Sequence, residues 1–257
     1  MSFDFTGKKV LVTGASRGIG LGVARGFANA NADLYIIATN KKVHESAAML
    51  TRETGQEVQG LVCDISDRAA VADVVGGLGQ LHVLINNAGY EQLTPILDPD
   101  PKIEETFRRI IEINVLGTYY VTREVATRMQ PGGRIVITSS VWGKTGSAGF
   151  SAYCASKHAN IGFMRVLAEE LGPRGIGVNA VCPGWVKTDA AMRSLGIIAR
   201  GEGRSEDDCL SEILSAQAIE GLMQPDDMAS TYLFLASDQA ANITGQALSV
   251  DRGELMD

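Results

Sequence analysis

The chain has 257 residues, of which 45% are hydrophobic, and its formal net charge is −7. This length suits one α/β domain with a substantial core, so we expect a single domain over residues 1–257. The acidic balance lacks the basic surplus that nucleic acid or an anionic membrane would attract, and we expect neither as a partner.

The sequence shows no pattern typical of a targeting signal, a membrane span or a metal site. No apolar run approaches the ~18 residues of a membrane-spanning helix, and residues 1–6 lack a basic and hydrophobic signal pattern. We therefore expect a cytoplasmic protein. The cysteines and histidines do not cluster at metal-ligand spacing, which predicts no metal site.

A glycine-rich turn follows the first predicted strand, residues 8–13. Gly14, Gly18 and Gly20 give the spacing G-x-x-x-G-x-G, and a helix begins at Gly18. Glycines at such a turn let the backbone approach a pyrophosphate, whose charge the helix N-terminus favours. Strand, turn and helix in this order predict a dinucleotide site.

The second predicted strand, residues 33–38, ends where dinucleotide-binding folds distinguish two cofactors. A carboxylate there would accept hydrogen bonds from the ribose 2′-hydroxyl of NAD. The chain has Thr39 and Asn40 instead, and Arg17 in the glycine loop can provide positive charge. We predict NADP(H) in preference to NAD(H); the alternative is that Arg17 and Lys41 are simply solvated.

Two further strands are predicted, at residues 57–63 and 81–85, after a helix near 43–54. The first ends at Asp64 and Ile65, and either Ser66 or Asp67 is suited to cap the next helix. The second runs into Asn-Asn-Ala-Gly at residues 86–89, which composition alone would make only a turn.

A long helix is predicted across about residues 102–129, after a proline-marked loop. Asn114 lies within it among apolar neighbours. A buried amide needs hydrogen-bond partners, so its simplest role is that of a satisfied core side chain.

The central segment joins a predicted strand to a helical pattern that has no proline between Gly149 and Pro173. Residues 134–139 form a buried strand, so Ser140 lies at its carboxyl end, where open α/β sheets bind ligands. Helical spacing after Gly149 puts Tyr153 and Lys157 one turn apart. A nearby cation lowers the phenol pKa from about 10 and makes tyrosine usable as an acid or base. The adjacent Cys154 is better explained as a small apolar filler than as a nucleophile.

The last third of the chain completes the strand and helix alternation. A strand at 175–182 leads into Pro-Gly-Trp-Val-Lys-Thr at 183–188, and a capped helix with Pro225 in its first turn precedes a final strand at 243–250. Residues 190–222 are glycine-flanked with apolar ends, which indicates a mobile lid over substrate or a plain surface excursion. The order predicts a Rossmann-like doubly wound parallel α/β sheet of about seven strands, with helices on both faces.

Taken together, these motifs resemble the short-chain dehydrogenase/reductase family over nearly the whole chain. The resemblance rests on residues 13–20, on residues 86–89, and on Ser140 with Tyr153 and Lys157. It implies hydride transfer between a nicotinamide and a ketone or secondary alcohol. Ser140 and Tyr153 would bind the carbonyl oxygen, Tyr153 would protonate the alkoxide, Lys157 would lower the tyrosine pKa and hold the ribose, and Asn114 would support a water-mediated proton relay.

The resemblance also implies a set of cofactor contacts. Asp64 and Ile65 would meet the adenine, residues 86–89 would lie beneath the cofactor, and Val186 and Thr188 would lie near the carboxamide. The complete set is Gly14, Ser16, Arg17, Gly18, Ile19, Gly20, Thr39, Asn40, Asp64, Ile65, Asn87, Ala88, Gly89, Tyr153, Lys157, Pro183, Gly184, Val186 and Thr188.

Substrate and assembly are less constrained. The family forms dimers or tetramers, so we expect a homodimer or homotetramer through the helices near 102–129 and 151–172. We favour a small ketone or alcohol, with contacts from residues 90–100, 142–150 and 185–222. The alternatives are a 3-oxoacyl-[acyl-carrier-protein] reductase, an NAD-dependent sugar or polyol dehydrogenase, and a catalytically silent dinucleotide sensor, which the four intact catalytic positions argue against.

Two positions depart from the family pattern. Leu222 follows Gly221 where relatives have Gly-Arg, and Arg252 stands where they have the first glycine of Asp-Gly-Gly. Arg252 has three possible roles: binding an acidic substrate group, contacting a partner subunit, or solvation.

Overall fold

The computed structural model describes residues 3–256. Met1 and Ser2, which begin the segment without a signal pattern, and Asp257, the last residue of the predicted domain, lie outside the described residues. Within 3–256, no helix combines the length and the apolar character that crossing a membrane requires.

Seven parallel strands form one sheet in the order β3-β2-β1-β4-β5-β6-β7. The strands are β1 (Lys9–Thr13), β2 (Asp33–Ala38), β3 (Val58–Val62), β4 (Val83–Asn86), β5 (Arg134–Thr138), β6 (Gly177–Pro183) and β7 (Ala247–Val250). Strand order reverses between β1 and β4, and at such a switch point the carboxyl ends of the strands open a crevice. The predicted Rossmann-like fold is confirmed.

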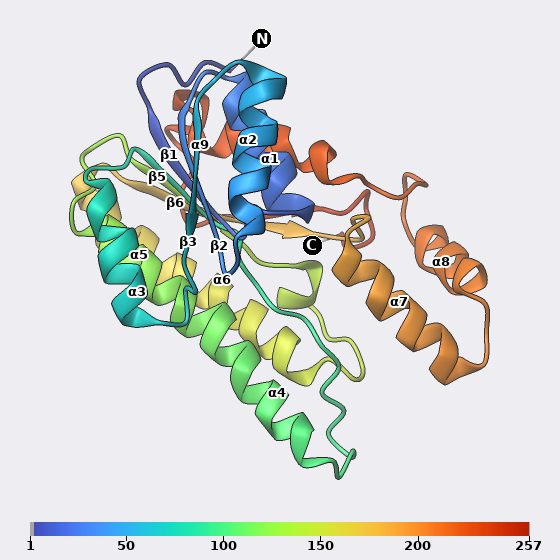
Figure 1. Ribbon diagram of the computed structural model, residues 1–257. Helices are drawn as coiled ribbons and strands as arrows, with labels where there is room; N and C mark the ends of the chain where they lie inside the picture. The colour runs from blue at the N-terminus through green and yellow to red at the C-terminus, as the bar shows by residue number, and fades with distance from the viewer. Residues whose placement is uncertain (1–2, 257) are drawn as a thin grey trace.

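Helices cover both faces of the sheet (Figure 1). One face carries α1 (Gly18–Asn29), α2 (Lys42–Thr54) and α9 (Ala229–Ala236), and the other carries α3 (Arg68–Val74), α5 (Thr118–Ala126) and α6 (Ser151–Leu171). Successive strand residues point to opposite faces, so Leu11 and Val12 enter different core clusters, and both are fully buried. The two cores fix the strand ends from both sides.

The helix predicted at 102–129 contains a π-helical turn and ends at Ala126. The structure has α4 (Pro101–Ile111) and α5, joined by a π-helical turn at Glu112–Gly117. A π turn admits an extra residue and often occurs at functional sites. Gly117 permits close packing there, since a Cβ at Gly117 would lie 2.7 Å from Cγ1 of Ile65. The predicted long helix is present as one helical run over 101–126, but apolar spacing did not reveal the inserted residue of the π turn.

The segment predicted as a lid contains α7 (Asp189–Glu202) and α8 (Glu206–Ser215). Their buried residues Leu195, Ala199 and Cys209 gather around Trp185 in a cluster separate from the two main cores. In Figure 1 the pair of helices stands apart from the sheet, beyond the carboxyl ends of the strands. The two helices therefore pack around a small hydrophobic core that is separate from the cores of the sheet.

Candidate active site

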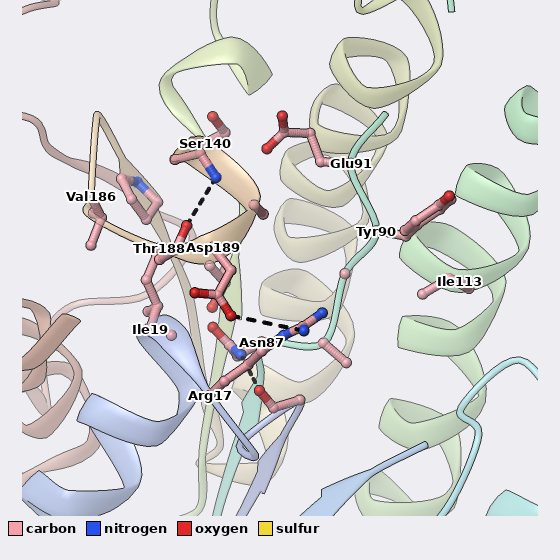
Figure 2. Close-up of a pocket in the computed structure, with 18 of the residues that line it drawn as sticks. Arg17, Ile19, Asn87, Tyr90, Glu91, Ile113, Ser140, Val186, Thr188 and Asp189 are labelled. Atoms are coloured by element: carbon pink, nitrogen blue, oxygen red, sulfur yellow. Dashed lines mark hydrogen bonds and ion pairs between the residues drawn. The ribbon is translucent and has the colours of Figure 1, made fainter. Parts of the chain in front are cut away.

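A cavity of about 550 Å³ runs along the carboxyl ends of the strands. Every predicted cofactor or catalytic residue lines it except Gly20 and Asn114. Figure 2 shows Arg17 at one end, and Glu91 and Ser140 at the other. The structure therefore brings together motifs that are spread over most of the chain.

The glycine turn packs directly on the segment after β4. Gly14 has a φ of +65°, and a Cβ there would lie 2.6 Å from Cα of Ala88. The Thr13 hydroxyl accepts hydrogen bonds from the N–H groups of Asn87 and Ala88, both at 2.9 Å. The Asn87 side chain donates to the carbonyl oxygen of Thr13 at 3.0 Å. Two motifs that lie more than seventy residues apart thus form one rigid floor.

The start of α1 is open to the cavity. Arg17 occupies the N-cap position without a side-chain capping bond, so the first helical N–H groups remain available to an anion. Gly20 lies beneath this turn: a Cβ there would lie 2.5 Å from the carbonyl oxygen of Gly14. Gly20 therefore permits close packing, and its predicted contact with the cofactor stays a prediction.

The end of β2 has no carboxylate. Thr39 and Asn40 line the cavity there, together with Lys42. Arg17 lies 4.0 Å from the carboxylate of Asp189, and both side chains are more than 70% exposed. Thr39, Asn40 and Lys42 can therefore contact a phosphate at the end of β2, where no carboxylate would repel it.

Asp64 lines the cavity at the end of β3, but its carboxylate is bonded within the protein. One oxygen accepts from the N–H and hydroxyl of Ser66 at 2.9 and 2.7 Å, and the other accepts from Arg109 at 2.8 Å. Burial pulls the pKa of Asp64 upward, but hydrogen bonds from Ser66 and Arg109 outweigh it and hold the pKa below its ordinary value. Of the two predicted caps, Asp67 is the one that caps α3.

Helix α6 presents Tyr153 and Lys157 one turn apart, as predicted. Lys157 is 3% exposed, its Nζ donates to the carbonyl oxygen of Thr138 at 2.9 Å, and this nitrogen lies 5.4 Å from the centre of the Tyr153 ring. Gly143 lets the segment after β5 approach α6, since a Cβ there would lie 2.9 Å from the carbonyl oxygen of Lys157. This approach brings Ser140 to Tyr153, whose phenol it hydrogen-bonds.

The pKa of Tyr153 differs from the sequence prediction. Burial raises it above its ordinary value, the Glu91 carboxylate acts in the same direction, and the hydrogen bond with Ser140 opposes them. Burial also lowers the pKa of Lys157 to about 8. Because burial and the Glu91 charge disfavour the phenolate more than the Ser140 hydrogen bond favours it, the phenol is protonated at neutral pH.

Asn114 lies behind the cavity wall and is fully buried. Its side-chain oxygen accepts from the N–H of Tyr90 at 2.7 Å, and its nitrogen donates to the carbonyl oxygen of Tyr90 at 3.0 Å and to Ser156 at 2.9 Å. These bonds match the simpler predicted role, a satisfied core amide, and they fix the backbone after Gly89. The proton relay stays a prediction.

Several cavity residues were not singled out by the sequence. They are Tyr90, Glu91, Trp142, Trp185 and Ser194. All fall in the three segments predicted to contact substrate, but no spacing rule marks individual positions within loops. Their only sequence signal is a polar or aromatic side chain close to a motif.

Arg252 lies away from the cavity lining. It has a φ of +57°, and its Nη1 donates to the carbonyl oxygen of Glu220 at 3.1 Å. Its guanidinium also packs beside Gly221, where a Cβ would lie 3.2 Å from Nη1. Arg252 thus joins the end of the chain to the segment after α8, an arrangement that none of its predicted roles described.

Known proteins resemble the chain over its whole length. A family model described as Enoyl-(Acyl carrier protein) reductase matches residues 14–254. The uncharacterized oxidoreductase YxjF of Bacillus subtilis (strain 168) is 34% identical over 250 residues, covering 95% of this chain and 96% of that protein. The 3-oxoacyl-[acyl-carrier-protein] reductase FabG of Chlamydia muridarum is 35% identical over 253 residues, covering 96% of both. The crystal structure of L-sorbose reductase from Gluconobacter frateurii, complexed with NADPH and L-sorbose, aligns with a TM-score of 0.90 and 26% identity, covering 100% of both chains.

Proposed function

Because the chain belongs to the short-chain dehydrogenase/reductase family and is an alcohol or ketone oxidoreductase, we propose that it reduces a small ketone with NADPH. One observation carries the proposal: Ser140, Tyr153 and Lys157 meet at the carboxyl end of β5, in the same cavity as the glycine turn.

The residues present fit a phosphorylated dinucleotide. The open N-terminus of α1 suits a pyrophosphate, and Arg17, Thr39 and Asn40 suit a 2′-phosphate because none carries a negative charge. When bound, the nicotinamide supplies the hydride. In support of this choice, the L-sorbose reductase that resembles the chain was crystallised with NADPH.

Tyr153 is the proton donor in this proposal. Its buried phenol is protonated at neutral pH and can give its proton to the developing alkoxide. The Ser140 oxygen accepts from the N–H of Trp142 at 3.1 Å, and the Ser140 hydroxyl, which hydrogen-bonds the Tyr153 phenol in the structure, turns to donate to the carbonyl oxygen of the bound substrate. Two donors thus converge on the oxygen where negative charge develops.

Lys157 provides a positive charge beside Tyr153 and hydrogen-bond donors for the cofactor. One of its three N–H donors is used by the carbonyl oxygen of Thr138 at 2.9 Å, so the others are available to ribose hydroxyls and water. Gly89 lies between Lys157 and Asn114: a Cβ there would be 3.5 Å from Nζ and 3.5 Å from the Asn114 side-chain oxygen. In this proposal Asn114, whose side chain is bonded to Tyr90 and Ser156, supports resupply of the proton through water.

The proposal extends to the lid and the assembly. α7 and α8 form a lid that closes over the substrate. A homodimer or homotetramer forms through α4, α5, the π turn between them and α6, where large apolar side chains are exposed: Phe107, Leu116, Tyr119 and Val166. Light scattering checks the assembly, and a monomer at working concentration contradicts it.

The decisive test follows loss of reduced-nicotinamide absorbance against a panel of ketones, with NADPH and NADH. Tyr153→Phe should lower turnover by roughly 10²–10⁴-fold and leave NADPH binding intact, because only the transferable proton is lost. Tyr35→Phe, which removes a hydroxyl from a half-buried residue on β2 outside the cavity lining, should retain normal turnover. Near-normal turnover in Tyr153→Phe would sink the assignment, and absence of ketone reduction by the wild type would sink the function.

A further inference from the structure

Glu91 is held in place at the substrate end of the cavity. The preceding residue, Tyr90, has both its N–H and its carbonyl oxygen bonded to the Asn114 side chain, at 2.7 and 3.0 Å. From the other side, the Ser194 hydroxyl on α7 donates to the Glu91 carboxylate. Ser194 is only 2% exposed and Glu91 is half-buried, so this link is partly shielded from solvent. The carboxylate is therefore fixed between the floor and the lid.

The charge of Glu91 acts on the reacting groups. It raises the pKa of both Tyr153 and Lys157, although burial is the larger influence on each. Figure 2 shows the Glu91 side chain at the Ser140 end of the cavity. A group bound to the Glu91 carboxylate would therefore belong to the same small molecule whose carbonyl lies at Tyr153.

Aromatic rings form the neighbouring wall. Trp142 meets Tyr153 edge-on, with ring centres 6.1 Å apart, and meets Trp185 edge-on at 6.3 Å. Flat apolar walls with a few fixed polar groups are typical of pockets for small molecules, in which the polar groups set orientation. Electron-rich ring faces also suit C–H bonds polarised by neighbouring oxygens.

We propose that Glu91, together with Ser194, binds hydroxyl groups of the substrate, and that the substrate is a neutral polyhydroxylated ketone such as a ketose. This inference rests on the proposed function and names the substrate class of that same site. Ser194 gives its hydrogen to Glu91, so both side chains present acceptor oxygens. The ligand must then supply donors, which hydroxyl groups do.

Competing substrate classes fit these contacts less well. A ketone carrying a carboxylate or phosphate would be repelled by Glu91. A purely apolar ketone would remove water from the carboxylate without replacing its hydrogen bonds. An amine-bearing ketone would satisfy Glu91, but it would bring a second cation beside the buried ammonium of Lys157.

The experiment measures kcat/KM with NADPH for four probes: L-sorbose, cyclohexanone, levulinate and aminoacetone. Glu91→Gln keeps the size and an oxygen for Ser194 but removes the charge. It should lower kcat/KM for L-sorbose by roughly 10–100-fold, since a hydrogen bond to a charged acceptor is lost. Cyclohexanone, which has no hydroxyl group for Glu91, should change by much less than L-sorbose, because it loses only the influence of the charge on the pKa values of Tyr153 and Lys157. Levulinate should improve. Glu57→Gln removes an exposed carboxylate at the amino end of β3 and should change none of them.

Sugar binding gives a readout that does not require turnover. The chain has 2 tryptophans, and both Trp142 and Trp185 line this cavity. Quenching of tryptophan fluorescence by L-sorbose, in the presence of NADP⁺, should weaken in Glu91→Gln and stay normal in Glu57→Gln. This result supports the inference even if the reaction itself has been misassigned.

Two results would overturn the inference. Equal losses for L-sorbose and cyclohexanone in Glu91→Gln show that Glu91 acts only by positioning the loop. A preference for aminoacetone that Glu91→Gln abolishes shows a cation site instead. Failure of the proposed function looks different, because ketone turnover would then be absent or independent of Tyr153.

Discussion

The two ends of the cavity are built in different ways. The cofactor end consists of turns that directly follow β1, β2 and β4, joined by the hydrogen bonds between Thr13 and Asn87. The substrate end takes Glu91, Trp142 and Ser194 from separate segments, one of which is α7 with its own small core. An end made of strand termini is rigid, whereas an end made of loops can vary without disturbing the sheet. Substitutions at one end should therefore leave binding at the other unchanged.

Lys157 lies where the two ends meet, so its loss should affect both. Lys157→Met keeps the length of the side chain and removes its charge and donors, and turnover should fall by roughly 10²–10⁴-fold. Binding of NADPH should also weaken. Steady-state kinetics and a fluorescence titration measure the two effects, and Lys102→Met, an exposed lysine on α4, is the control.

The pH profile ties this effect to the lysine charge. Burial lowers the pKa of Lys157 to about 8, against weaker opposing influences from Cys182 and Glu91. The ammonium is present below that value and lost above it, so wild-type kcat for reduction should fall as pH rises through about 8. The step should be absent in Lys157→Met. A wild-type profile that is flat around pH 8 contradicts the role given to the charge.

The rigidity of the cofactor end rests on Gly14. Gly14→Ala would force a non-glycine residue to a φ of +65° and place a Cβ 2.6 Å from Cα of Ala88. We expect a loss of about 2–5 kcal/mol in the free energy of unfolding. In Gly77→Ala the added Cβ meets nothing within 4 Å and needs no positive φ, so it serves as the control. Thermal unfolding that is equal in both variants would show that the turn can relax.

The contrast between a cofactor end made of strand termini and a substrate end made of loops also explains which residues the sequence could predict. Gly14, Ser140 and Tyr153 were found because they follow strands or share a helix face, and these relations are periodic in the sequence. The π turn at Asn114 escaped, since an inserted residue leaves the apolar pattern almost unchanged. The raised pKa of Tyr153 escaped as well, because burial, its largest cause, is a property of the folded chain. Glu91 meets Ser194 only through the fold, as 103 residues separate them.

The substrate end can be tested separately through Trp142. Trp142→Leu removes its edge-on contacts with Tyr153 and Trp185 and should raise KM for the ketone by roughly 3–10-fold. KM for NADPH should not move. Phe163→Leu changes an aromatic on α6 outside the cavity lining and is the matched control. Equal changes in both Michaelis constants for Trp142→Leu would break the division between the two ends.

The smallest effect is expected at Arg17, at the far tip of the cofactor end. Its side chain is 71% exposed, so solvent screens its charge, and its contribution to selecting NADPH should resemble that of an exposed ion pair. Arg17→Ala should therefore reduce the preference for NADPH over NADH by only roughly 2–5-fold, with no effect on KM for the ketone. Lys41→Ala removes a neighbouring exposed cation outside the cavity lining and should leave the preference unchanged. Added salt should shrink the Arg17 effect, because screening weakens exposed charges first. If the preference is unaltered in Arg17→Ala, then Thr39, Asn40 and Lys42 must hold the 2′-phosphate, and selection of the cofactor lies at the end of β2 itself.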